Sequence, residues 1–360
     1  MKVLIVFNQP APYKVRLFSL LAKSVDLTVI FEKKSCPNRH SLFYASNIYD
    51  FNHIFLKKGS FGEENSSSNE IIKHLKENKY DLIIMNGYHT ITEQKTIRYM
   101  NRHKIKWVLF INGGLIKKES ILKKIYKTSL IKTASYYLSP CEKANEYLTY
   151  YGAKKENIYL YPNSTIYEKD VLQSLPSEQD KMDVINKYHL PFKNFYICPT
   201  QFIKRKNNMT LLKVFKDRKE TLLLVGNGVE EDKYKQYIEE NNMNTVHILP
   251  YLSSNDLYEY FKVAKGLITL SFEDIYGHTV NEAFAKGLIV ISSNNVVAAT
   301  KLIKNNINGF IVPPTDIKAI NDALDKVDTL QREECLKVAR ENTFEKQAQV
   351  MVEIMKGLTK

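Results

Sequence analysis

The chain has 360 residues, of which 44% are hydrophobic, and a formal net charge of +13 at pH 7. Because a single hydrophobic core rarely grows beyond about 250–300 residues, this length predicts two domains. No apolar run approaches the about 18–20 residues that a helix needs to cross a bilayer. The four cysteines match no metal-ligand spacing, and we expect reduced thiols in the cytoplasm at Cys36, Cys141, Cys198 and Cys335.

The positive charge is concentrated in the first half of the chain. Residues 1–170 contain 27 Lys and Arg against 15 Asp and Glu, whereas residues 171–360 contain 25 against 24. A lysine-rich proteome explains part of the excess but not its uneven distribution. We therefore expect the two halves to face different partners.

Strand-like and helix-like stretches alternate through the first half. Helical patterns such as residues 15–23 and 146–152 lie between apolar or β-branched runs. Near-continuous apolar strands between helices are typical of a parallel sheet covered on both faces. The predicted strands are residues 3–7, 27–31, 81–85, 107–111, 136–139 and 158–161.

The second half repeats this alternation after a polar segment from Pro162 to Lys193, which we interpret as a linker and a first helix. Its predicted strands are residues 195–198, 221–225, 245–249, 267–270 and 288–292. The fold class is therefore α/β, with two Rossmann-like, doubly wound domains. We place them at residues 1–165, joined by a C-terminal helix over 344–360, and at 190–343. Ligands of such sheets bind at the carboxyl ends of strands, here in a cleft between the domains.

The stretch from Leu267 to Gly287 predicts a strand, a polar loop and the start of a helix. A helix start presents unpaired N–H groups and a partial positive charge, which favour a phosphate. Asp274 and Glu282 flank this point and would face sugar hydroxyls attached to the phosphate. Either acid alone is equally well explained as a helix cap or a dipole-favoured carboxylate worth ~0.5–1 kcal/mol. Their spacing within the longer string favours a ligand.

That string, S-x-x-D-x-Y-G-x-x-x-x-E-A-x-A-x-G from Ser271 to Gly287, resembles the signature of the retaining nucleotide-sugar glycosyltransferases of family 4. This family has the GT-B fold, in which two Rossmann-like domains face each other. Residues 222–231, 249–265 and 305–316 resemble other segments of the family's donor domain, and residues 146–165 resemble the end of its acceptor domain.

The resemblance implies donor contacts in the second half. Glu282 would hold the ribose, and Asp274 would hold the donor sugar, although a glutamate is usual at that position. A further group would contact the nucleotide and its diphosphate: Gly277, His278, Thr279, Asn227 and Gly228.

The basic motif QFIKRKNN, residues 201–208, follows the strand at 195–198. Cations at a strand end stabilise the charge that develops on a departing nucleotide. The family's usual arginine is replaced by Gln201, so the resemblance assigns this role to Lys206 and Arg205. Without that context, such a run is most often a solvated loop.

In the first half, Asn112 stands where many relatives carry a histidine that points at the donor sugar. Asparagine can bind a hydroxyl but cannot exchange protons. His89, at the end of the preceding strand, is a possible substitute, and it is equally well explained as a surface or packing histidine. We place the acceptor near Pro12, Tyr13, Lys14 and Gly113.

The chain contains no Asp-x-Asp pair, and the series Asp322, Asp325 and Asp328 has the spacing of a solvated helix face. We therefore expect no metal and no cofactor besides the nucleotide-sugar co-substrate.

Residues 116–134 contain six lysines and one glutamate, with Ile121, Leu122, Ile125, Tyr126 and Leu130 on one helical face. Such a helix suits an anionic membrane surface, and residues 11–23 are similar. The alternative is that both helices pack their apolar sides on the sheet. Nucleic acid would also suit the charge, but no binding motif supports it.

Together these features predict a cytoplasmic, metal-independent, retaining glycosyltransferase that is peripheral on the membrane. It would transfer a sugar from a nucleotide diphosphate to a polyprenyl-diphosphate-linked saccharide for a surface polysaccharide. Two alternatives remain: an inverting transferase or epimerase on the same fold, and an inactive sugar-nucleotide-binding subunit. The departures at Gln201, Asn112 and Asp274 favour the inactive subunit.

Overall fold

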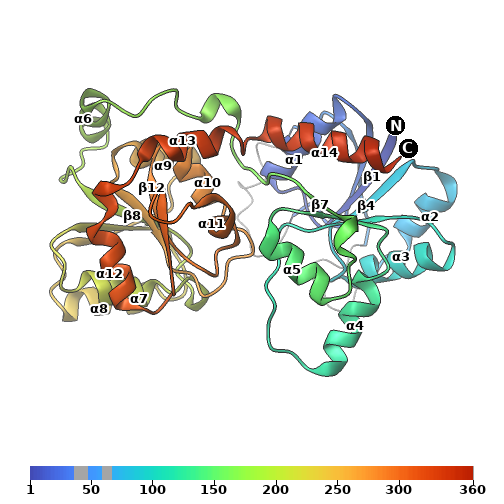
Figure 1. The fold of residues 1–360 in the computed structure, drawn as a ribbon, viewed down its shortest axis with the longest axis horizontal. Coiled ribbons are helices and arrows are strands. Elements are labelled where there is room, and N and C mark those ends of the chain that lie inside the picture. The colour runs from blue at the N-terminus through green and yellow to red at the C-terminus, as the bar shows by residue number, and fades with distance from the viewer. Residues whose placement is uncertain (36–47, 59–66, 360) are drawn as a thin grey trace. The chain divides into compact units, whose positions relative to one another are not determined.

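The computed structural model describes residues 1–35, 48–58 and 67–359, and the chain divides into two compact units (Figure 1). Unit 1 comprises Met1–Ser164 and Phe344–Lys360, and unit 2 comprises Thr165–Thr343. Cys36 lies outside the described residues, and the other three cysteines are buried free thiols. Within the described ranges, no helix combines the length and apolar character that crossing a membrane requires.

Unit 1 is built on a parallel sheet in the order β3-β2-β1-β4-β5-β6-β7. All residues from Val3 to Phe7 in β1 are buried, as a strand covered on both faces requires. β1 pairs with β2 on one side and β4 on the other, so the winding of the chain reverses there. The strands are β1 (Lys2–Phe7), β2 (Asp26–Phe31), β3 (Asn52–Phe55), β4 (Leu82–Met85), β5 (Val108–Phe110), β6 (Tyr136–Ser139) and β7 (Ile158–Leu160).

Helices connect these strands, and the C-terminal helix of the chain packs beside α1 (Figure 1). α1 begins at Pro12, whose fixed φ suits a first helical position, and it buries Val15, Phe18 and Leu21. The prediction of a membrane-facing helix at residues 11–23 is therefore wrong, because this apolar face is already covered. The helices are α1 (Pro12–Ala22), α2 (Glu70–Glu77), α3 (Ile91–Arg102), α4 (Ile121–Ile131), α5 (Glu142–Tyr150) and α14 (Phe344–Leu358).

Unit 2 repeats the plan with a parallel sheet in the order β10-β9-β8-β11-β12-β13. The strands are β8 (Phe195–Pro199), β9 (Thr221–Val225), β10 (Val246–Leu249), β11 (Gly266–Thr269), β12 (Ile289–Ser293) and β13 (Gly309–Val312). The helices are α6 (Glu178–Lys187), α7 (Asn208–Phe215), α8 (Glu231–Glu240), α9 (Ser254–Val263), α10 (Thr279–Phe284), α11 (Val297–Leu302), α12 (Ile317–Asp325) and α13 (Arg332–Arg340). The two parallel sheets confirm the predicted α/β fold class.

Two features differ from the sequence-based expectation. The segment expected to be a linker is fastened to unit 2, because Leu172 N donates to Ala285 O and Arg340 donates to the carbonyls of Leu172 and Gln173. The acidic series is not one helix face, because α12 ends at Asp325 and Asp328 lies in the following 3₁₀ turn, Val327–Thr329.

Candidate functional site

A mostly buried ion pair of unit 2 lies where β8 and β11 end. These strands are neighbours in the sheet, so the loops that follow them meet at its carboxyl edge. Lys206 ends a 3₁₀ turn after β8, and Asp274 lies in the loop after β11. Lys206 Nζ is 2.5 Å from Asp274 Oδ2, and the two side chains are only 15% and 19% exposed. The structure thus joins two residues that the sequence analysis assigned to one donor site.

Main-chain contacts hold these two loops together. Phe272 N donates to Arg205 O over 2.9 Å, and Arg205 Nη1 donates to Glu273 O over 2.5 Å. The predicted diphosphate ligand Arg205 therefore uses part of its guanidinium to fix the loop that carries Asp274. Arg205 thus shapes the site as well as adding charge to it.

Asn207 is a component of this edge that the sequence analysis missed. Its backbone is left-handed, with φ of +58°, and its side chain is buried. Asn207 Nδ2 donates to Leu270 O at 3.0 Å and to Pro314 O at 2.8 Å, which anchors the basic turn to the ends of β11 and β13. The sequence did contain a signal for this position: an asparagine between a basic turn and a helix often adopts the left-handed conformation.

The turn before α10 depends on a glycine. Gly277 has φ of +91°, and a Cβ there would lie 2.3 Å from Val296 Cγ1 and 3.7 Å from Asp274 Cγ. Gly277 is therefore required by conformation and by space, and it lies beside Asp274. His278 and Thr279 follow and are partly exposed, and the ring of His278 lies 4.8 Å from that of Tyr276.

Glu282 lies on the short helix α10, which runs only from Thr279 to Phe284. Its Oε1 accepts a hydrogen bond of 2.9 Å from the hydroxyl of Thr165, a partner the sequence analysis did not identify. Burial of the carboxyl raises the pKa of Glu282, and the bond from Thr165 partly opposes this. A half-buried carboxylate with one oxygen engaged retains acceptor capacity for a ligand hydroxyl.

The predicted Gly-x-Gly turn after β9 has a packing reason. Cβ atoms at Gly226 and Gly228 would lie 1.9 Å from Thr200 O and 2.5 Å from Phe202 O. Phe202 N donates to Asn227 O at 2.7 Å, which fastens the turn to the segment after β8. The side chain of Asn227 is exposed at this same carboxyl edge.

The acceptor residues predicted in unit 1 differ in accessibility. Pro12 and Tyr13 are partly exposed at the start of α1, but Lys14 is only 1% exposed. Lys14 Nζ lies 3.4 Å from Asn163 Oδ1 and 4.9 Å from the centroid of the Phe110 ring. Burial lowers the pKa of Lys14 to about 7. Its amine therefore lies inside unit 1 in this structure.

Asn112 and Gly113 follow β5, and His89 follows the neighbouring strand β4. Asn112 Oδ1 is buried and has no hydrogen-bond partner among the described residues, so it retains a free acceptor. His89 is exposed, its ring lies 4.3 Å from that of Tyr88, and its main-chain N–H donates to Glu93 Oε2. The structure thus brings both candidate groups to one edge of the unit 1 sheet.

A buried carboxyl pair behind this edge was not predicted. Glu93 accepts the main-chain N–H groups of His89 and Thr90, and the Thr90 hydroxyl donates to Glu32 Oε1 over 2.6 Å. Burial, followed by the nearby Glu32 carboxyl, raises the pKa of Glu93 to about 8. The pair controls the backbone that carries His89. In the described part of the chain, no three His, Cys, Asp or Glu side chains form a group that could hold a metal.

Comparisons with known proteins agree with this architecture. Residues 184–346 match the family Glycosyl transferases group 1. A glycosyltransferase from Rickettsia africae ESF-5 has a similar structure, with TM-score 0.77 and 16% identity, covering 100% of this chain and 99% of that chain. The structure of HepE of Anabaena in complex with UDP has a TM-score of 0.75 and 16% identity, covering 99% of this chain and 100% of that chain. The lipopolysaccharide outer core galactosyltransferase WaaB has a TM-score of 0.70 and 15% identity, with the same coverage of both chains. No curated protein matches the sequence.

These similarities show that the chain has the GT-B fold. A group 1 glycosyltransferase domain covers most of unit 2. Fold and domain together indicate a glycosyltransferase enzyme.

Proposed function

We propose that the protein is a retaining glycosyltransferase of family 4 that transfers a sugar from a nucleotide diphosphate to a saccharide acceptor. The observation that carries the proposal is the Lys206–Asp274 ion pair beside Gly277, at the carboxyl edge of the unit 2 sheet. This is the edge where doubly wound sheets bind ligands. The complex of HepE with UDP supports a nucleotide donor.

In this proposal, the ion pair exchanges partners when the donor binds. Lys206 turns to the diphosphate and Asp274 accepts hydrogen bonds from hydroxyls of the donor sugar. Negative charge then develops on the diphosphate as the glycosidic bond breaks, and the fixed cation of Lys206 stabilises it. Arg205 adds positive charge and keeps the Asp274 loop in place. These two cations would replace a metal ion.

Glu282 takes the other end of the donor. Its carboxylate, oriented by Thr165, would accept hydrogen bonds from the ribose hydroxyls. A charged acceptor in a partly desolvated position gives stronger hydrogen bonds than a neutral one. The main-chain groups of Gly277, His278 and Thr279 would contact the diphosphate between the two acids.

The acceptor is assigned to unit 1, at the edge that carries Tyr13, Asn112, Gly113 and His89. The free acceptor oxygen of Asn112 is suited to a sugar hydroxyl. We propose a lipid-linked saccharide of a surface polysaccharide, and the similarity to the lipopolysaccharide galactosyltransferase WaaB supports this class. Retention of configuration rests on the family resemblance.

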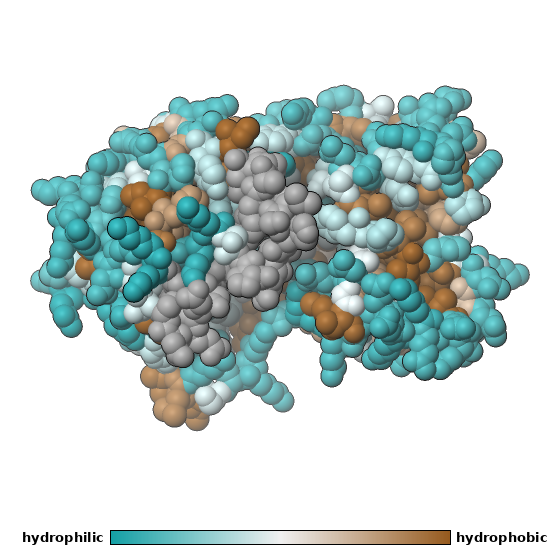
Figure 2. Space-filling model, turned by 180° about the vertical axis from the view of Figure 1, so that it is seen from behind, coloured by the Kyte–Doolittle hydropathy of each residue, from teal (hydrophilic) through white to brown (hydrophobic). Residues whose placement is uncertain are grey.

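Helix α4 supports a location on the cytoplasmic face of a membrane. Its residues Ile121 and Leu122 are 77% and 80% exposed, and Ile125 and Tyr126 are exposed as well. α4 projects at the lower right in Figure 1, and a hydrophobic patch lies at the corresponding lower left in Figure 2, which is turned by 180°. The predicted alternative, in which this apolar face packs on unit 1, applies to the C-terminal end of α4, where Leu130 and Ile131 are buried.

Polar contacts hold α4 from its other side. Lys127 Nζ lies 2.6 Å from Glu119 Oε2 and 3.2 Å from the hydroxyl of Tyr151. The first two turns of the helix therefore turn Lys127 inward and leave Ile121, Leu122 and Ile125 exposed, with exposed lysines beside them. Apolar insertion combined with about 1 kcal/mol per lysine near anionic lipid suits a membrane surface. The lysines are Lys117, Lys118 and Lys123.

A thermal-shift screen against UDP-, GDP-, ADP- and dTDP-sugars tests the donor assignment, because a ligand that binds only the folded state raises the melting temperature. The true donor should raise it, and Glu282→Ala should abolish the rise. An unchanged shift in Glu282→Ala would remove the ribose assignment. Slow release of free nucleotide separates an enzyme from an inactive binding subunit. Proton NMR of the anomeric configuration in the product separates retention from inversion.

A further inference from the structure

Unit 2 contains a cavity at the opposite edge of its sheet from the proposed donor site. Its volume is about 690 Å³, within the range of small-molecule pockets. Phe195, Thr221 and Ile289, the first residues of β8, β9 and β12, line it. The strands are parallel, so this cavity lies at their amino ends, and the donor edge lies at their carboxyl ends.

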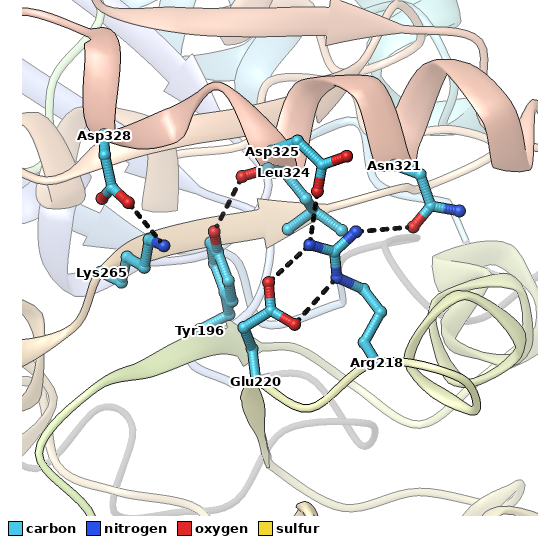
Figure 3. A network of polar contacts seen from close by, with 8 residues as sticks. All are labelled: Tyr196, Arg218, Glu220, Lys265, Asn321, Leu324, Asp325 and Asp328. Atoms are coloured by element: carbon cyan, nitrogen blue, oxygen red, sulfur yellow. Dashed lines mark hydrogen bonds and ion pairs between the residues drawn. The ribbon is translucent and has the colours of Figure 1, made fainter.

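The carboxylates that line this cavity are all paired. Lys265 Nζ lies 2.8 Å from Asp328 Oδ2, and Arg218 holds Glu220 with two nitrogens, as Figure 3 shows. Lys181 Nζ lies 2.6 Å from Glu178 Oε1. These contacts neutralise the acidic part of the lining.

The same network fixes the wall of the cavity. The hydroxyl of Tyr196 donates to Leu324 O over 3.2 Å, and Arg218 also contacts Asn321 and Asp325 of α12 (Figure 3). The wall is therefore tied to both the sheet and the helix that follows β13. A preformed wall favours binding because less ordering accompanies it.

Three cations of the lining form no ion pair among the described residues of unit 2. Arg332, Lys193 and Lys219 line the cavity, and none of them forms an ion pair within residues 165–343. Arg332 Nε donates to Gly287 O, but Arg332 Nη2 is buried without a hydrogen-bond partner in unit 2. Burial lowers the pKa of the Arg332 guanidinium, and the nearby carboxyl groups of Glu178 and Asp328 oppose this shift. An acceptor atom placed beside this guanidinium would satisfy its unpartnered donor.

We propose that this cavity is a binding site for a phosphorylated small molecule, separate from the donor site. The phosphoryl group would bind Arg332, and Lys193 and Lys219 would balance its second charge. Apolar side chains of the lining, including Met182, Ile185 and Leu330, would cover the remainder of the ligand.

Calorimetric titration of the full-length protein with pyrophosphate tests the site. Pyrophosphate is also a probe for the donor edge, so the variants Arg332→Gln and Lys206→Ala are compared. We expect two classes of binding in the wild type. Arg332→Gln should weaken one class by about tenfold or more, and Lys206→Ala should weaken only the other. Lys337→Gln, an exposed change on the same helix as Arg332, should change neither.

Loss of the Arg332–Gly287 contact could alter the fold, so the exposed residue Lys193 provides a second test. Lys193→Gln should weaken the same class several-fold with an unchanged melting temperature. If the wild type shows a single class that is lost in Lys206→Ala, or if neither Arg332→Gln nor Lys193→Gln weakens any class, the proposed site is wrong. The donor assignment is unaffected by that result.

Discussion

Lys206 Nζ lies 2.5 Å from Asp274 Oδ2, and this ion pair joins two segments that are 68 residues apart in the sequence. β8 and β11 are adjacent in the sheet, and their following loops carry the two partners. Both side chains are mostly buried, so solvent screens their charges less than those of an exposed ion pair. A ligand that binds either residue must therefore compete with the other.

This competition predicts that removing Asp274 affects binding of the nucleoside diphosphate and binding of the intact sugar nucleotide differently. In Asp274→Asn, Lys206 loses its partner, so the nucleoside diphosphate should bind more tightly than in the wild type. The intact sugar nucleotide should gain less or bind more weakly, because the acceptor for its sugar hydroxyls is gone. Titration calorimetry with both ligands measures the difference. Asp322→Asn, an exposed change on α12, is the control, and equal weakening of both ligands in Asp274→Asn would contradict the partner exchange.

The rate of sugar transfer should depend more strongly on Lys206 than donor binding does. Removing one preorganised group that stabilises developing charge lowers kcat by about 10²–10³. We expect Lys206→Ala to show this loss in a nucleotide-release assay, with a smaller effect on KM. A change in KM alone would mean that Lys206 binds substrate and transition state equally.

Glu282 predicts a pH dependence of donor binding. Burial raises its pKa, and only the ionised carboxylate accepts hydrogen bonds from both ribose hydroxyls. Donor affinity should therefore rise as the pH rises through this pKa. Thr165→Val removes the hydrogen bond that lowers the pKa, so the midpoint should move to higher pH, whereas Thr165→Ser should keep it.

The unliganded protein must be measured alongside, because the same group affects stability. Its folded pKa is raised, so its contribution to stability is present below the unfolded pKa and is lost as the pH rises through the folded pKa. In Glu282→Gln, both the affinity rise and this stability loss should disappear. A pH profile of donor affinity that survives in Glu282→Gln would assign the dependence to another group.

Any side chain at position 277 should lower the free energy of unfolding in two ways. Gly277→Ala places a Cβ 2.3 Å from Val296 Cγ1 and forces a left-handed backbone on alanine. The conformation alone costs about 1–2 kcal/mol, and the steric overlap adds to it. Adding Val296→Ala should relieve the overlap but not the backbone strain, so the double variant should recover part of the stability. Urea unfolding measures the stability of the single and the double variant. Complete recovery of stability in the double variant would show that the positive φ of Gly277 is unimportant.

The sequence predicts most strands of this fold because their apolar runs are buried on both faces. It misses β3, whose residues Asn52, His53 and Ile54 are exposed, and the four-residue strand β13, which begins at Gly309. Both lie at an edge of their sheet, and β3 lacks the buried apolar run that marks most of the other strands.

For the candidate site, the sequence shows what lies within one segment but not which distant segments meet. The spacing of Asp274, Gly277 and Glu282 lies within one segment and is readable in the sequence. The pairing of Lys206 with Asp274 depends on strand order, and the contact of Thr165 with Glu282 spans 117 residues. Neither follows from a local pattern.

Glu93 predicts a pH-dependent stability of unit 1. Its pKa is raised to about 8 by burial and by Glu32, so its stabilising contribution is present below about pH 4.5 and is lost as the pH rises through about 8. Over this window the loss is on the order of 1 kcal/mol per pH unit. Glu93→Gln keeps an oxygen acceptor for the N–H groups of His89 and Thr90 without the ionisation. Its stability should therefore change less between pH 5 and pH 9.

Chemical unfolding followed by the far-ultraviolet signal at several pH values measures this effect. Glu77→Gln, an exposed change on α2 whose partner Lys73 is also exposed, should leave the wild-type profile unchanged. If Glu93→Gln and the wild type lose equal stability over this range, ionisation of the pair does not control this part of the fold.

The exposed face of α4 predicts binding to anionic membranes by two separable contributions. The double variant Ile121→Ser/Leu122→Ser removes apolar insertion, and Lys117→Gln/Lys118→Gln removes two charges near the lipid. Each should lower binding to phosphatidylglycerol vesicles by on the order of tenfold, and only the charge variant should reduce the sensitivity to salt. Ile317→Ser, an exposed apolar change in unit 2, should bind like the wild type. Cosedimentation at low and high salt distinguishes these outcomes. Equal binding by all variants, or equal binding to uncharged phosphatidylcholine vesicles, would mean that this face has a different partner.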